Sequence, residues 1–266
     1  KGGSHYQFSV QGHGLMYLVN LPFFFLGLIL LLKRTFNRDR VSILLLSWLM
    51  FAPIPSSLTR EAPHVLRSIV MLPIPMILSA IGITYLISNL QSIITKLRYF
   101  LLIAYLTLIF IFLGNYLQKY LGEYRSEYSK SWQYGYKEVV EYTKENYKKY
   151  DKIIVTKKYG EPHEFFLFFW PWDPECYGND PNLNRFYQSN WYWVDSFDKF
   201  YFVNDWDIPI EEWQDFVLES GDVISCPINS VKCLLITSPG NVPKGWIKLE
   251  TINFLDGQSA FEIYEN

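Results

Sequence analysis

Four long apolar runs fill most of the first half of the chain, and a polar segment rich in aromatic residues makes up the second half. About twenty apolar residues are needed to cross the hydrocarbon core of a bilayer; two runs meet this length readily and two are marginal. The pattern therefore predicts a membrane α-helical bundle of four transmembrane helices. We expect these helices at residues 14–32, 41–54, 68–86 and 99–117, between an external loop remnant at 1–13 and a soluble domain at 118–266.

Prolines lie inside or beside three of the apolar runs. Pro22 lies in the first run, Pro53 and Pro55 mark the end of the second, and Pro73 and Pro75 interrupt the third. Proline is tolerated in a spanning helix when neighbouring helices satisfy the backbone groups that it frees. We therefore expect a packed bundle with a kink at Pro22, rather than a set of isolated anchors.

Basic residues in two short loops predict the orientation of the bundle. They are Lys33, Arg34, Arg38, Arg40, Lys96 and Arg98. Basic loops favour the cytoplasmic side, which places the N-terminal tail, the 55–67 loop and residues 118–266 outside the cytoplasmic (inner) membrane. Arg60 and Arg67, offset by Glu61, lie on the opposite side and need a separate explanation. The chain begins with Lys-Gly-Gly and shows no signal-peptide pattern, so we expect it to be a C-terminal fragment with further spans upstream.

The second half alternates helix-like and strand-like segments, which predicts an extracytoplasmic α/β domain. Apolar residues at 134–147 recur with a helical spacing, and the run at 151–156 indicates a buried strand. Pro162 is expected to begin a helix that continues to Trp170. Further expected elements are a continuation of the last span to 128, a loop at 171–185, strands at 199–203 and 231–237, a helix at 210–218, and a hairpin of 246–254 with 259–264.

Charge and metal-ligand spacing exclude some functions. The net charge of −2 provides no basic face, so we expect no nucleic-acid partner. The four histidines show no ligand spacing, so the sequence predicts no metal site and assigns no cofactor, although it leaves a divalent metal open. Asp173-Pro-Glu175 with Asn179-Asp180 has calcium-type oxygens but lacks the pattern of a calcium loop, and we expect a solvated turn there.

The cysteines and the aromatic residues each leave two alternatives. Cys226 and Cys233 would close a short disulfide loop and leave Cys176 free, or all three are buried thiols. The aromatic segments at 165–172 and 191–193 would form a platform for an acceptor glycan, or a core and a membrane-interface belt. Four aspartates are candidates for contacts to sugar hydroxyls: Asp195, Asp198, Asp205 and Asp207.

A polar cluster lies between the second and third runs, in Thr59-Arg-Glu-Ala-Pro-His-Val-Leu-Arg67. Ionisable groups at a membrane surface are unfavourable unless they are paired or functional. Arg60, His64 and Arg67 would bind a lipid phosphate, because guanidinium groups present parallel donors to an anion. The alternative is that these residues contact ordinary lipid headgroups and cap the next helix.

The same segment carries a family resemblance. Leu58-Thr-x-x-x-Pro63-His64-x-x-Arg67, followed by Leu72-Pro73 and Ala80-x-Gly82, resembles the C-terminal spans of the GT-C glycosyltransferases, in particular the protein O-mannosyltransferase and aminoarabinose transferase group. Gly2-Gly-Ser-His5-Tyr, Gly12-His13-Gly and Tyr159-Gly-Glu-Pro162 are similar to segments of bacterial members of that group.

The resemblance implies transfer of a sugar from a polyprenyl-phosphate carrier to an unknown glycan, lipid or protein acceptor on the outer membrane face. It implies donor-phosphate contacts at Arg60, His64 and Arg67, and acceptor-side positions at His5, Tyr6 and His13. The family's catalytic acidic residue lies in a first external loop without a counterpart here, so the fragment is expected to be inactive alone. The alternative function is a membrane-anchored extracytoplasmic binding or sensor module without catalysis.

Overall fold

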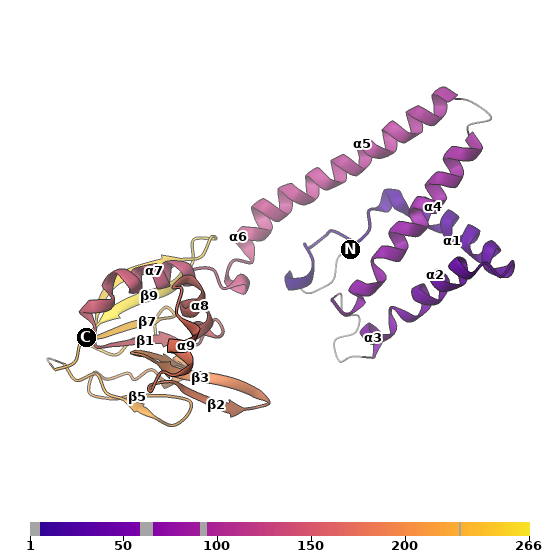
Figure 1. Cartoon of the computed structure of the whole chain (residues 1–266). Coiled ribbons are helices and arrows are strands. Elements are labelled where there is room, and N and C mark those ends of the chain that lie inside the picture. Colours follow the sequence, from indigo (N-terminus) through magenta and orange to yellow (C-terminus); the bar gives the residue numbers. More distant parts are fainter. Residues whose placement is uncertain (1–5, 59–65, 91–94, 229) are drawn as a thin grey trace. The chain divides into compact units, whose positions relative to one another are not determined.

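The computed structural model describes residues 6–58, 66–90, 95–228 and 230–266 and divides the chain into two compact units. The first unit, Lys1–Tyr124, is helical, and the second, Arg125–Asn266, is an α/β domain (Figure 1). Within the described residues, four helical segments are long and apolar enough to cross a membrane. They are Leu18–Phe36, Arg40–Ser57, Leu66–Asn89 and Tyr99–Glu127.

The helical unit consists of short 3-10 turns and long α-helices. Its elements are η1 (Tyr6–Phe8), η2 (Leu18–Asn20), α1 (Leu21–Phe36), α2 (Arg40–Phe51), α3 (Ile54–Ser57), η3 (Leu66–Met71), α4 (Pro73–Leu90), α5 (Thr95–Lys119) and the π-helical turn η4 (Tyr120–Tyr124). Pro22 lies in the first turn of α1 and Pro73 begins α4. The kink expected at Pro22 is therefore wrong, because a first-turn proline removes an N–H that has no helical partner.

Helices α1 and α4 pack with their backbones in contact. A Cβ atom at Gly27 would lie 1.9 Å from the carbonyl oxygen of Leu78, and a Cβ atom at Gly82 would lie 2.1 Å from that of Phe23. Small residues permit this close approach, which is the usual way in which apolar helices associate when burial from water provides no drive. Around the contact, Leu31, Ile74 and Leu78 form the buried core of the unit.

A buried polar contact joins α5 to the start of α1. Asn20 is 6% exposed, and its Oδ1 accepts a hydrogen bond of 2.7 Å from the Tyr105 hydroxyl. The Tyr105 ring also packs edge-on against Phe23, at 5.3 Å between centroids. A hydrogen bond among apolar helices fixes the rotation of α5 about its own axis, which apolar packing alone leaves loose.

The α/β domain contains a seven-stranded mixed sheet in the order β2-β3-β4-β1-β7-β9-β8. Strand β1 lies between β4 and β7 and runs parallel to both, and the outer pairs are antiparallel. The helices are α6 (Arg125–Glu127), η5 (Lys130–Trp132), α7 (Tyr136–Asn146), η6 (Tyr147–Lys149), α8 (Pro162–Phe169), α9 (Pro174–Gly178) and η7 (Asp205–Asp207). The strands are β1 (Lys152–Thr156), β2 (Asn184–Gln188), β3 (Trp191–Phe197), β4 (Phe200–Val203), β5 (Phe216–Val217), β6 (Val223–Ile224), β7 (Cys233–Thr237), β8 (Ile247–Asn253) and β9 (Ser259–Glu265).

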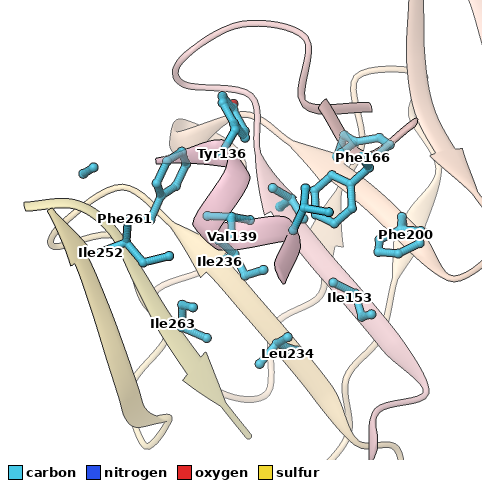
Figure 2. Close-up of a cluster of buried hydrophobic side chains, with 14 of the residues drawn as sticks. Tyr136, Val139, Ile153, Phe166, Phe200, Leu234, Ile236, Ile252, Phe261 and Ile263 are labelled. Carbon is cyan, nitrogen blue, oxygen red and sulfur yellow. The ribbon is translucent and has the colours of Figure 1, made fainter. Parts of the chain in front are cut away.

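Helices α7 and α8 cover one face of this sheet. Figure 2 shows the side chains of Tyr136 and Val139 from α7 and Phe166 from α8 gathered with side chains of the sheet. Ile153 in β1 and Ile236 in β7 belong to this cluster and are fully buried. Successive strand residues point to opposite faces, so the neighbouring Ile154 and Leu235 lie in a second buried cluster on the other face.

Residues 204–228, which we call the cover segment, lie over that other face. The helix expected at 210–218 is wrong: Phe216 and Leu218 are 1% and 3% exposed, whereas Val217 between them is 44% exposed, as in a strand. Ile210 and Trp213, in the first part of the expected helix, face solvent. The burial of Phe216 and Leu218, two positions apart, follows the periodicity of a strand and not that of a helix.

The remaining strand predictions for the domain are confirmed, and the structure adds four strands that were not predicted, β2, β3, β5 and β6. Strands β1, β4 and β7 and the β8–β9 hairpin form where they were expected, and α8 begins at Pro162. Within the expected loop 171–185, the chain forms α9 and begins β2. A disulfide joins Cys226 to Cys233, and Cys176 is free and exposed, so the alternative of three buried thiols is excluded. The disulfide connects the cover segment to the start of β7.

The glycine contact between α1 and α4 predicts a clear difference between glycines. Gly27→Ala or Gly82→Ala should lower the unfolding temperature of the protein in detergent, because overpacking by one methyl group costs about 1–3 kcal/mol. Gly114→Ala in α5 is the matched control, since a Cβ there meets no atom within 4 Å. Thermal unfolding followed by circular dichroism measures the difference. Equal stability of the three variants would contradict the backbone contact.

Candidate functional site

The structure describes one of the three residues of the predicted phosphate-binding cluster, Arg67. Arg60 and His64 lie outside the described residues. Arg67 is exposed and lies in η3, six residues before the start of α4 at Pro73. The Trp48 indole N–H of α2 donates a hydrogen bond of 3.1 Å to the Val70 carbonyl, which holds η3 against α2. The structure thus gives Arg67 a defined backbone position and an exposed side chain.

Of the predicted acceptor-side residues, His5 lies outside the described residues, and Tyr6 and His13 belong to the helical unit. The Tyr6 backbone carbonyl accepts a hydrogen bond of 2.7 Å from the Tyr124 hydroxyl. The His13 ring packs edge-on against Tyr116, with 5.6 Å between centroids, and its buried Nδ1 has no hydrogen-bond partner among the described residues. These contacts attach the segment before α1 to the end of α5.

The α/β domain contains a cavity of about 620 Å³. It lies among α8, α9 and the hairpin formed by β2 and β3, and polar and aromatic side chains line it. They are His163, Glu164, Leu167, Tyr177, Arg185, Tyr187, Asn190, Trp191, Tyr192 and Val194. We regard this cavity as the candidate functional site.

Local structure brings these residues to one place. Pro162 begins α8, and residues one, two and five positions into that helix share the face that lines the cavity. In the hairpin, Arg185 pairs with Val194 and Tyr187 pairs with Tyr192, so all four lie on one face. The connecting residues Ser189 and Asn190 both have positive φ, of 54° and 63°, as a tight two-residue hairpin turn requires.

Aromatic contacts order the hairpin side of the cavity. The guanidinium carbon of Arg185 lies 4.4 Å from the centroid of the Tyr192 ring, a cation–π distance. The rings of Tyr187 and Tyr192 are 5.1 Å apart. Both rings remain exposed to solvent: Tyr187 is 61% exposed and Tyr192 is 56% exposed.

The charge state of His163 follows from its surroundings. Burial, together with the positive charges of Lys157 and Arg185, lowers the pKa of His163 to about 4, so its imidazole is neutral at neutral pH. Its Nδ1 is buried without a hydrogen bond among the described residues, although the Glu161 carboxylate lies 3.5 Å away. Burial raises the pKa of Glu161. A neutral imidazole offers one donor and one acceptor, so His163 can accept or donate a hydrogen bond to a ligand.

A buried ion-pair network lies near the cavity and holds the cover segment against the sheet. The Lys157 ammonium contacts the carboxylate of Asp195, which is completely buried, and lies 3.1 Å from Glu219. Asp195 also accepts a hydrogen bond of 2.7 Å from the Ser220 backbone N–H. This network joins the end of β1, the middle of β3 and the cover segment, and its charges are all satisfied, as buried charges must be.

The four aspartates predicted as sugar contacts do not line the cavity. Asp195 is buried in the ion-pair network, so its predicted role is wrong. The carboxylate of Asp198 accepts a hydrogen bond from Tyr147, and that of Asp207 accepts one of 3.2 Å from Asn204. The carboxylate of Asp205 accepts hydrogen bonds at the carboxyl edge of the parallel strands. Its donors are Thr156, Ser238 and Asn241.

No metal centre occurs in the part of the chain that the structure describes, where no three histidine, cysteine or acidic residues are grouped suitably. The carboxylate of Asp173 caps α9 by accepting from the backbone N–H groups of Glu175 and Cys176, at 2.8 and 3.1 Å. That of Asp180 accepts from the Asn182 N–H at 2.8 Å. The solvated turn expected at these residues is therefore wrong in part, because Pro174–Gly178 form helix α9 with Asp173 as its N-cap.

The sequence analysis identified only part of this cavity. It singled out the aromatic run at 191–193, but it missed Arg185, which fell in the expected loop 171–185, and Tyr187, which was assigned to no element. The available signal was the pair of aromatic-rich segments on either side of Ser189-Asn190. No family of known proteins, curated protein or solved structure matches the chain. The chemistry of the site is therefore inferred from its own residues.

The lowered pKa of His163 predicts a dependence of stability on pH. Above its unfolded pKa of 6.5 the imidazole is neutral in both states and adds no pH dependence. As the pH falls from 6.5 to about 4, the unfolded chain binds a proton that the folded domain does not, so the free energy of unfolding decreases. The full effect is about 3 kcal/mol.

Urea unfolding followed by tryptophan fluorescence at about pH 7.5 and about pH 4.5 would measure this loss. Carboxylates also titrate near the lower pH, so each protein is compared with itself at the two pH values. His163→Gln should lose less stability on acidification than the unmodified chain. An identical loss in both proteins would show that His163 titrates normally in the folded domain.

Proposed function

We propose that the chain is the C-terminal part of an integral-membrane glycosyltransferase. It would move a sugar from a polyprenyl-phosphate carrier to an acceptor on the outer face of the cytoplasmic membrane. In this proposal Arg60, His64 and Arg67 contact the donor phosphate, and the α/β domain lies outside the membrane on the acceptor side. The residue that performs the chemistry is expected upstream of this chain, as the resemblance to GT-C glycosyltransferases implies.

The observation that carries this proposal is the close packing of the helical unit. An anchor requires only apolar surface, whereas α1 and α4 touch through Gly27 and Gly82, and Asn20 is buried against Tyr105. Such contacts hold helices in one geometry, which an intramembrane binding site requires and an anchor does not. The same packing leads directly, through η3, to the loop that carries the basic cluster.

Two further features support the external placement of the α/β domain. The loop between the first two spans contains Lys33, Arg34, Arg38 and Arg40, which favours a cytoplasmic location for that loop. The disulfide between Cys226 and Cys233 is typical of proteins outside the cytoplasm, because cytoplasmic reductants keep thiols reduced.

The second candidate function is a membrane-anchored extracytoplasmic binding or sensor module. The cavity favours it, because every residue that lines the cavity belongs to the α/β domain. The two functions differ in what they require of the basic cluster. A binding module tolerates neutral residues at Arg60, His64 and Arg67, whereas a transferase loses donor use.

The exposed free thiol of Cys176 offers a direct test of the topology. A membrane-impermeant maleimide added to intact cells should label Cys176, because the domain is proposed to face outward. Cys176→Ser should abolish the labelling. In that background, Asn37→Cys places a thiol in the loop after α1 and should react only after lysis. The opposite pattern of labelling would reverse the proposed orientation.

Substitution of Arg67 tests the transferase proposal in the complete protein. Arg67→Ala should raise the KM for a polyprenyl-phosphate sugar by about tenfold or more, because a hydrogen bond to a charged group contributes about 1.5–3 kcal/mol. Arg67→Lys should retain part of the affinity, since it keeps the charge but not the parallel donors. Arg38→Ala, in the opposite loop, serves as the control. Unchanged donor kinetics in Arg67→Ala would assign Arg67 to lipid headgroups instead.

A further inference from the structure

The cavity beside α8 combines exposed aromatic rings with polar groups of different kinds. The first half of β3 is exposed, with Trp191 at 59% and Tyr192 at 56%, whereas Val194 to Phe197 at its other end are buried. Aromatic side chains that line a concave site and stay exposed to solvent are common in binding sites. Their flat faces suit a ligand that also has flat apolar faces.

The hydrogen-bonding groups narrow the class of ligand. The Arg185 guanidinium provides only donors, the Glu164 carboxylate oxygens provide acceptors, and neutral His163 provides one of each. A purely anionic ligand would be repelled by Glu164, and a purely cationic one would be repelled by Arg185. Hydroxyl groups both donate and accept, so a neutral polyhydroxyl compound can satisfy all three side chains together.

The geometry of the polar groups indicates that the site is already organised. Arg185 is held over the Tyr192 ring at 4.4 Å, which reduces the loss of side-chain entropy on binding. The His163 side chain is 12% exposed, and its Nδ1 is buried 3.5 Å from the Glu161 carboxylate, so packing holds the imidazole ring in place. The volume of about 620 Å³ falls within the range of about 300–1,000 Å³ that small-molecule sites occupy.

We propose that this cavity is a binding site for a short neutral saccharide. Trp191 and Tyr192 stack on the C–H faces of the sugar rings, and His163, Glu164 and Arg185 bind their hydroxyl groups. Binding of the saccharide does not depend on the transferase proposal. Its further assignment as the sugar acceptor rests on that proposal.

The test is a titration of the full chain in nanodiscs with mannotriose, N-acetylchitotriose, maltotriose and the anionic trigalacturonate. Calorimetry and tryptophan fluorescence follow binding. At least one neutral trisaccharide should bind saturably with a Kd of about 1 mM or lower. Trp191→Ala and Tyr192→Ala should each weaken that binding by about tenfold, through loss of a stacking face. Arg185→Met, which keeps the apolar stem, should weaken it as well.

Trp213→Ala is the matched control. Trp213 is 77% exposed, lies in the cover segment and does not line the cavity, so its loss should leave binding unchanged. Thermal unfolding confirms that each variant is folded. Arg67→Ala should bind the saccharide normally even if donor use fails, which separates this inference from the transferase proposal.

Three results would overturn the proposal. The first is the absence of saturable binding by every neutral trisaccharide to the folded full chain. The second is an equal loss of binding in Trp213→Ala and Trp191→Ala, which would place the sugar elsewhere. The third is tighter binding of trigalacturonate than of any neutral probe, which would assign the cavity to an anionic ligand.

Discussion

The central sheet of the α/β domain has two apolar faces, and the rest of that domain serves to cover them. Strands β4, β1 and β7 are buried on both sides, because Ile153 and Ile154 point to opposite clusters that are both closed to water. Parallel strands with two apolar faces are stable only when both are covered. Helices α7 and α8 cover one face, and the cover segment, joined to β7 by the disulfide and to Lys157 by ion pairs, covers the other.

The candidate site lies at the β2–β3 side of the sheet, where the strands are not buried on both faces along their whole length. The β2–β3 hairpin extends from the side of the sheet beyond the covered strands, so its turn and the adjoining residues remain in water. Helix α8 turns Phe166 to the core and His163 to the cavity. The same two elements therefore stabilise the domain with one face and form a polar, aromatic concavity with another. This division explains how aromatic residues of a single sequence region serve both the core and the proposed saccharide site.

The sequence predicted the elements that have a clear period and missed those that depend on tertiary contacts. Runs and patterns of apolar residues were enough to predict the four apolar helices, the strands β1, β4 and β7, and the C-terminal hairpin. The start of α8 was predicted from Pro162. The cover segment did not, because Ile210 and Trp213 have helical spacing yet face solvent. Asp195 could not be recognised as structural, since its partner Lys157 is distant in the chain. Most of the cavity was missed for the same reason: its residues come from α8, α9 and the β2–β3 hairpin, which only the fold brings together.

The position of β8 at the end of the sheet has a further consequence. An edge strand presents unpaired backbone groups that invite pairing with another sheet. The side chains of β8 are exposed apart from Ile252. Two of them are charged and lie two positions apart in the strand: Lys248, which forms an ion pair with Glu262 of β9, and Glu250. In the proposed setting, many copies of this domain share one membrane plane, where diffusion in two dimensions makes edge-to-edge encounters frequent. Charged side chains on an exposed edge strand, here Lys248 and Glu250, are a common means by which proteins limit such pairing.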